Sequence, residues 1–295
     1  MKPWILAAAL GAAAPAAAEP FAAPVDLPDG ATWTLQATRS RTHDPASSRP
    51  SSEAATSYRL TLRRRDGRPD VLIVQPSEGG LWGYAAVKGP IEVEVDESLA
   101  PTGLPDWPSL RTKIEAVIRE TAPGPYIDDA AAAVTSPMSA DVASRVFFPE
   151  LALASIGQNL DIEAGAPVPY EDQLPNPLGG PPITSLAAFE VTSVDSDHAV
   201  VRWRQAFDPQ SAARSITQAM NRLVKDLAPD QATKFAEASK GMGVERNDEC
   251  LSRIERKTGL SVETRCSTVI RVTAEGKSQT RTDVWTITQS LPKTP

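Results

Sequence analysis

The chain has 295 residues, 41% hydrophobic and 23% charged, a composition that excludes a wholly disordered chain or a collagen-like fibre. Its 37 acidic and 30 basic side chains give a net charge of −7, which disfavours nucleic acid and anionic membrane surfaces as partners. The 27 prolines favour loops and short elements over long helices. Two Cys and two His leave few residues for metal or histidine-dependent chemistry.

The first 18 residues have the pattern of a secretory signal peptide. Lys2 gives a positive start, residues 5–14 are an apolar run, and residues 16–18 are the alanines of a cleavage site. The run is shorter than the about 20 residues of a transmembrane helix, and no cysteine follows the site to carry a lipid. We therefore expect a periplasmic or secreted protein with no transmembrane segment after cleavage.

Residues 19–30, with three prolines, are expected to form an extended leader, and residues 31–295 a single α+β domain. Alternating or continuous apolar residues predict strands at 33–37, 58–62, 71–74, 81–87 and 91–95. The polar segment 42–55 is predicted to be a loop, so this half of the chain is expected to be an antiparallel meander.

Helices are predicted after the meander. Asp106 can cap a helix with Leu110 and Ile114 on its apolar face, and short helices are expected at 130–134 and 139–147. Residues 165–182 contain six prolines and are predicted to be an irregular connector between two halves of the chain.

The second half repeats this order of strands and helices. Phe189 is predicted to lie opposite Trp203 in a hairpin, and an amphipathic helix begins at Asp208. A short helix is expected at 230–240, and the last 50 residues are predicted to be strands. The fold class is therefore α+β: a curved antiparallel sheet of about ten strands in two groups, with four or five helices packed on one face.

The two cysteines can be placed by counting along a hairpin. A turn at 257–259, with Gly259 in a left-handed conformation, pairs Arg256 with Leu260 and hence Cys250 with Cys266. Facing cysteines on neighbouring strands are close enough for a disulfide, and the periplasm is oxidising. We therefore predict a Cys250–Cys266 disulfide on the more apolar face of this hairpin.

A turn at 275–276 extends the same register. It sets Cys266 opposite Trp285 and Thr264 opposite Ile287. The helix that begins at Asp208, with Ile216, Met220 and Leu223, is the simplest cover for this face. A close fit would make the face a filled core, which is the favoured alternative; a gap would create an apolar site walled by Trp285, Met220 and the disulfide.

Catalytic motifs do not assemble in this sequence. His43 and His198 are both expected to be solvated, and no G-x-S-x-G motif supplies a nucleophile. Lys257-Thr258-Gly259 and the S-x-x-K at 290–293 occur in the wrong order for a penicillin-recognising enzyme. No catalytic, metal or cofactor-binding residue is assigned, and no cofactor is expected.

Several segments resemble a group of exported, periplasmic, β-rich proteobacterial proteins that carry no assigned activity. The likeness lies in the signal peptide and in four segments spread over the mature chain. These are PELALA (149–154), LPNPLGG (174–180), IERKTGLSVE (254–263) and TDVWTIT (282–288). The resemblance implies a periplasmic β-rich domain and no functional residues.

The leading hypothesis is a non-catalytic exported envelope protein that binds an apolar small molecule or an envelope protein partner. The alternative is an enzyme of unrecognised, hydrolase-like type, which would need a cleft that collects several polar residues with shifted pKa values.

The signal peptide gives the first testable prediction. Exported protein is expected to be cleaved after Ala18, because the alanines at 16–18 match the small-residue requirement of a signal peptidase. Intact-mass spectrometry of protein purified from the periplasm measures this directly, and a mass that still includes residues 1–18 would contradict it.

Overall fold

The computed structural model describes residues 20–45, 47, 49–79, 89–121, 135, 138–174, 182–225, 242–274 and 276–291. The signal peptide, the strand expected at 81–87 and the helices expected at 130–134 and 230–240 lie outside these residues. Within them, most elements are antiparallel strands, and eleven strands form one sheet. The α+β class with an antiparallel sheet is confirmed.

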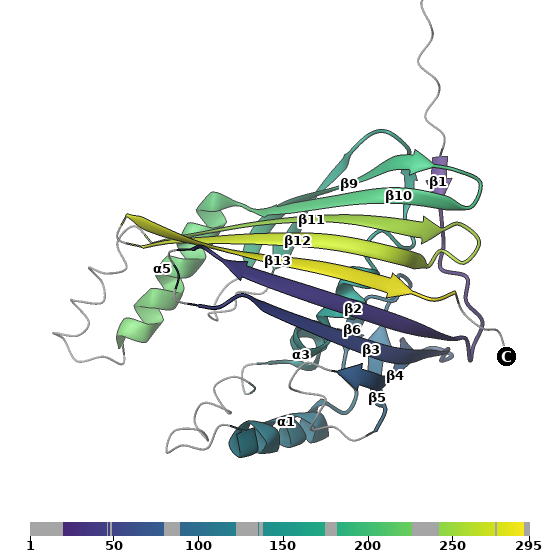
Figure 1. Cartoon of the computed structure of the whole chain (residues 1–295), viewed down its shortest axis with the longest axis horizontal. Helices are drawn as coiled ribbons and strands as arrows, with labels where there is room; N and C mark the ends of the chain where they lie inside the picture. Colours follow the sequence, from purple (N-terminus) through teal and green to yellow (C-terminus); the bar gives the residue numbers. More distant parts are fainter. Residues whose placement is uncertain are drawn as a thin grey trace, which may run out of the picture.

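The large sheet has the order β6-β5-β4-β3-β2-β13-β12-β11-β10-β9-β8. Its first five strands in the chain are β2 (Thr32–His43), β3 (Ser52–Arg63), β4 (Asp70–Gly79), β5 (Ile91–Val95) and β6 (Pro101–Gly103). The other six are β8 (Val168–Leu174), β9 (Ile183–Val194), β10 (His198–Phe207), β11 (Gly243–Glu255), β12 (Ser261–Ala274) and β13 (Lys277–Gln289). The two expected groups of strands are one continuous sheet, joined where β2 pairs with β13 (Figure 1).

Two predicted irregular segments are partly strand. The loop expected at 42–55 is shorter, because β2 runs to His43 and β3 begins at Ser52. The connector expected at 165–182 contains β8, whose Pro169 is tolerated because an edge strand uses hydrogen bonds on one side only. A second small sheet pairs β1 (Pro20–Ala22), in the leader, with β7 (Asp161–Glu163).

The structure describes four helices, α1 (Trp107–Thr121), α3 (Ala140–Phe147), α4 (Pro149–Ala154) and α5 (Pro209–Lys225). The helices α1 and α3 match the predictions made from Asp106 and from 139–147, whereas α4 was not predicted as a helix. Figure 1 places α5 at one end of the large sheet, and α1 and α3 lie elsewhere beside it.

The predicted disulfide is confirmed. Cys250 and Cys266 are cross-strand partners joined by a disulfide, with 4.1 Å between their Cα atoms. The turn that leads there differs from the prediction, because Glu255 rather than Arg256 bonds to Leu260. A bulge after Arg253 then restores the register in which the cysteines meet.

The predicted pairs of Cys266 with Trp285 and of Thr264 with Ile287 are also confirmed. We call the face of the large sheet that carries the disulfide and Trp285 the core face. Trp285 is 8% exposed and each cysteine 1%, and all three belong to the main hydrophobic core with residues of α1, α3 and α4.

The helix that contacts this part of the sheet is not the one expected. The short helix α4 contacts β12 and β13, whereas α5, which begins after Asp208, contacts β9 and β11. The hydrophobic residues of α4 include Leu151 and Ala154, both in the main core. Ile216 of α5 is buried but lies outside that core, and the side chains of Met220 and Leu223 fall outside the described residues.

Replacing Trp285 tests how much the filled core on this face contributes to the free energy of unfolding. Trp285→Ala is expected to lower the free energy of unfolding by about 3 to 5 kcal/mol, the usual cost of removing a buried aromatic side chain. Urea denaturation followed by far-UV circular dichroism gives the value. Val284→Ala, on the opposite face of the same strand, is the control and should cost less than about 1 kcal/mol. Similar losses in both variants would contradict a filled core at Trp285.

Candidate functional site

Three aromatic side chains form a wall on the core face of β8, β9 and β10. Phe189 and Trp203 are the predicted cross-strand pair, and Tyr170 stacks on Phe189 with 5.6 Å between ring centroids and 9° between planes. The Trp203 indole Nε1 donates a hydrogen bond to Tyr170 Oη at 2.8 Å. Stacking and hydrogen bonding together hold the three rings in one arrangement. We call Tyr170, Phe189 and Trp203 the aromatic wall.

Two loops face the aromatic wall. One is residues 155–160 after α4, in which Gly157 has a φ of +85°. A Cβ atom on Gly157 would lie 3.1 Å from Val201 of β10, so this loop packs closely on the sheet. The other is residues 96–98, where Asp96 Oδ1 accepts hydrogen bonds from the backbone N–H groups of Ser98 and Ala100. Both loops are therefore held by local structure.

The wall and the loops line an open pocket of about 400 Å³, within the range of small-molecule sites. Its lining includes the three aromatic rings, Glu97 and Gln158. The Gln158 side chain is 4% exposed, and its Nε2 donates to the Ala154 carbonyl at 2.7 Å. Gln158 Oε1 is buried and accepts no hydrogen bond from the described residues.

The phenol of Tyr170 stays neutral in this setting. Burial raises its pKa, the hydrogen bond from Trp203 lowers it, and the charge of Asp172 raises it, with a net rise. Since Tyr170 Oη accepts from Trp203, its own hydrogen remains for a second bond. The pocket therefore offers apolar ring faces and one hydroxyl donor.

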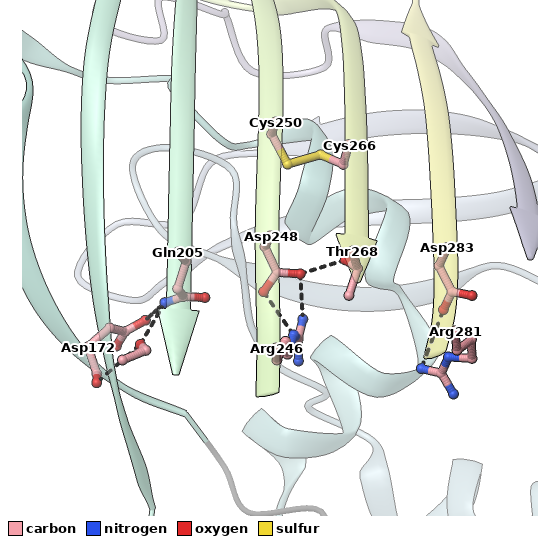
Figure 2. Close-up of polar contacts among 10 residues, drawn as sticks. Asp172, Gln205, Arg246, Asp248, Cys250, Cys266, Thr268, Arg281 and Asp283 are labelled. Atoms are coloured by element: carbon pink, nitrogen blue, oxygen red, sulfur yellow. Dashed lines mark hydrogen bonds and ion pairs between the residues drawn. A yellow bond between two sulfur atoms is a disulfide. The ribbon is translucent and has the colours of Figure 1, made fainter. Parts of the chain in front are cut away.

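A row of polar side chains crosses the core face next to the disulfide (Figure 2). Gln205 Nε2 lies 3.3 Å from Asp172 Oδ2, and Asp248 Oδ1 accepts a hydrogen bond from Thr268 Oγ1 at 2.5 Å. Asp248 also accepts two hydrogen bonds from Arg246, at 2.8 and 3.2 Å. Each carboxylate of this row therefore has a polar partner on the sheet.

Asp283 continues the row on β13. Its carboxylate accepts two hydrogen bonds from Arg41, at 2.7 and 2.9 Å, and lies 3.4 Å from Arg281. Burial by itself would raise the pKa of Asp283, but the Arg41 hydrogen bond and the charges of Arg281, Arg41 and Arg39 leave it lowered. Asp283 is thus held as a carboxylate.

Glu150 of α4 is a fully buried acid. Neither carboxyl oxygen has a geometric hydrogen-bond partner among the described residues, although Tyr58 and Arg39 lie near enough to stabilise its charged form. Burial dominates and raises the pKa of Glu150 to about 7. Below that pH the side chain is a neutral acid within the core.

The histidines are not brought together. His43 ends β2 opposite Arg281, and His198 begins β10 opposite Glu255; both are partly exposed. Within the described ranges, no group of three or more His, Cys, Asp and Glu side chains is placed to hold a metal ion. Sequence reasoning predicted the pairing of Phe189 with Trp203 but assigned neither residue to a site. It missed Tyr170 and Gln158, because the prolines of 165–182 hid a strand and loop 155–160 has no periodic pattern.

No family model matches the chain, and no curated protein matches it either. Among solved structures, an outer membrane channel from Pseudomonas putida F1 aligns with this chain, and the alignment covers 90% of this chain and 97% of the channel. The identity is 8% and the TM-score 0.18. In the part of the chain that the structure describes, no helix is both long and apolar enough to cross a membrane.

The buried Glu150 predicts a pH-dependent stability. Its pKa is about 7 in the folded protein and near 4.5 when unfolded, so the folded state binds the extra proton between these values. Stability is therefore expected to fall as the pH rises from about 4.5 to 7, by about 3 kcal/mol.

Glu150→Gln should remove this penalty, so the variant gains stability over the wild type at pH 8 but much less at pH 5. Urea denaturation at both pH values measures the difference. Glu263→Gln, at an exposed position on β12, is the matched control and should show no such gain. An equal difference between Glu150→Gln and the wild type at the two pH values would contradict the buried-acid assignment.

Proposed function

We propose that this is a non-catalytic exported envelope protein that binds a small ligand with an apolar face against the aromatic wall. The observation that supports the proposal is the set of three rings, hydrogen-bonded and stacked into a fixed surface beside a pocket of about 400 Å³. Tyr170 is 37% exposed, so its ring is available to a ligand. Pre-arranged aromatic surfaces bind well because they lose little conformational entropy on binding.

The polar groups of the pocket narrow the ligand chemistry. Glu97 is exposed at the rim, and its negative charge disfavours an anion there. The proposed ligand is therefore neutral or cationic, with a flat or aliphatic portion for the rings.

In this proposal the helices lie on the side of the sheet that carries the pocket. The main core, which joins Trp107 of α1, Phe147 of α3 and Leu151 of α4 to the disulfide, supports that arrangement. The loop 155–160 directly follows α4, so the packing of α4 on β12 and β13 sets the position of one pocket wall.

A fluorescent probe tests the proposal. The uncharged N-phenyl-1-naphthylamine should bind the mature protein saturably, and Tyr170→Ala should weaken binding at least about tenfold, because an exposed anchoring ring is lost. Tyr170→Phe, which keeps the ring, should retain binding within about threefold.

Leu186→Ala is the matched control. Leu186 is 56% exposed and lies on β9, the strand of Phe189, but its side chain is on the opposite face of the sheet. Its binding should equal that of the wild type. Absence of saturable binding to the wild type, or an equal loss in Leu186→Ala and Tyr170→Ala, would overturn the proposal.

A further inference from the structure

Four arginines gather on the core face beyond the disulfide. Arg39 and Arg41 lie on β2, Arg281 on β13 and Arg246 on β11. Arg39 is the partner of Trp285, Arg41 of Asp283, and Arg281 lies one row further on. The Arg39 guanidinium sits 5.3 Å from the centroid of the Trp285 ring. We call these four residues the arginine cluster.

The arginine cluster carries more positive than negative charge. Asp248 and Asp283 are the two carboxylates hydrogen-bonded to it among the described residues, and both are saturated by Arg246 and Arg41. Glu150 lies near Arg39, but its raised pKa keeps it largely protonated up to about pH 7. The arginine cluster thus has an excess of two positive charges in a protein whose net charge is −7.

Arg281 is poorly satisfied by its neighbours. Its only ion pair among the described residues is 3.4 Å long, to a carboxylate that Arg41 already holds. Arg281 Nε is buried and has no hydrogen-bond partner among them. Burial lowers the pKa of Arg281; Asp283 opposes this, and the charges of Arg41, Arg246 and Arg39 lower it further. All three other arginines are therefore near enough to repel it.

An ion from solution can reach these side chains. The side chain of Arg41 is 27% exposed, that of Arg281 35% and that of Arg246 38%. Guanidinium groups present paired N–H donors that match the oxygens of phosphate. A dianion would neutralise the excess charge of the cluster and accept hydrogen bonds from the exposed N–H groups of its guanidiniums.

We propose that the arginine cluster is a binding site for a phosphate group, with Arg281 and Arg39 as its main donors. The group is either free phosphate or the phosphate of a lipid headgroup, which share this chemistry. The site is separate from the pocket of the aromatic wall, whose acidic rim disfavours anions. Arg41 donates hydrogen bonds to Asp283 and Arg246 to Asp248, and the positive charges of both arginines add to the electrostatic potential at the site.

Isothermal titration with inorganic phosphate, at an ionic strength matched with chloride, tests the site. The mature wild-type protein should bind phosphate with a Kd below about 1 mM, and Arg281→Gln should weaken it at least about tenfold, the usual effect of losing one charged hydrogen-bonding partner. Arg39→Gln should act in the same direction. Arg265→Gln is the control, since Arg265 is exposed on the opposite face of β12.

Thermal melting separates ligand binding from a structural role. In phosphate-free buffer Arg281→Gln should melt no lower than the wild type, because it removes a repelled charge, and phosphate should raise the Tm of the wild type only. Unchanged N-phenyl-1-naphthylamine binding in this variant keeps this test apart from that of the aromatic wall. The inference would be overturned if the wild type bound no phosphate at concentrations up to about 10 mM. It would also be overturned if Arg265→Gln lost as much phosphate affinity as Arg281→Gln.

The same titration with dihexanoyl phosphatidic acid, below its micelle concentration, separates the two sources. Binding at least about tenfold tighter than that of inorganic phosphate, and abolished in Arg281→Gln, would support a lipid headgroup. Equal affinity for both, again lost in that variant, would support free phosphate. Binding of the lipid that is unaffected by Arg281→Gln would contradict a phosphate site at the cluster.

Discussion

One row of cross-strand pairs determines what the core face of this sheet presents. Across six strands it joins Phe189, Trp203, the Cys250–Cys266 disulfide, Trp285 and Arg39. Because side chains alternate between faces, a slip of one residue at any of these pairings would turn the row outward. The disulfide forbids that slip between β11 and β12. Both the aromatic wall and the arginine cluster therefore depend on this register.

The two proposed sites lie toward different ends of that row and differ in charge. The aromatic wall uses the edge of the sheet at β8, where neighbours are few and rings remain partly exposed. The arginine cluster uses central strands, where side chains from β2, β11 and β13 can act on one another. The disulfide and the buried Trp285 lie between Trp203 and Arg39 in this row.

Local pairing was predictable from the sequence, and packing between distant segments was not. Turn glycines and alternation were enough to place Cys250 against Cys266 and Phe189 against Trp203. The predicted turn before the disulfide was wrong by one residue. A β-bulge compensates for this error, so the predicted pairing of the two cysteines is still correct. The pairing of two of the three aromatic-wall residues was therefore predictable, although the sequence assigned neither of them to a binding site.

The remaining features depend on tertiary contacts that leave no periodic signal. The helix α4 spans 149–154, too short for an amphipathic pattern, and its buried Glu150 is the opposite of what a core position normally shows. The strand β8 is stabilised by its neighbour β9 despite Pro169. The two arginines of β2 are far in the chain from those of β11 and β13, and the pairing of β2 with β13 brings them together.

That pairing of β2 with β13 also sets the order in which the chain can fold. The first long strand of the protein finds one of its two neighbours only when the last strand is available, and the leader is held in the same way by the Thr258 carbonyl, which accepts from the Asp26 N–H. Contacts of such long sequence separation form slowly. The strand β2 therefore stays unpaired on one edge until nearly the whole chain is available, and the sheet can close into one piece only as the last step of folding.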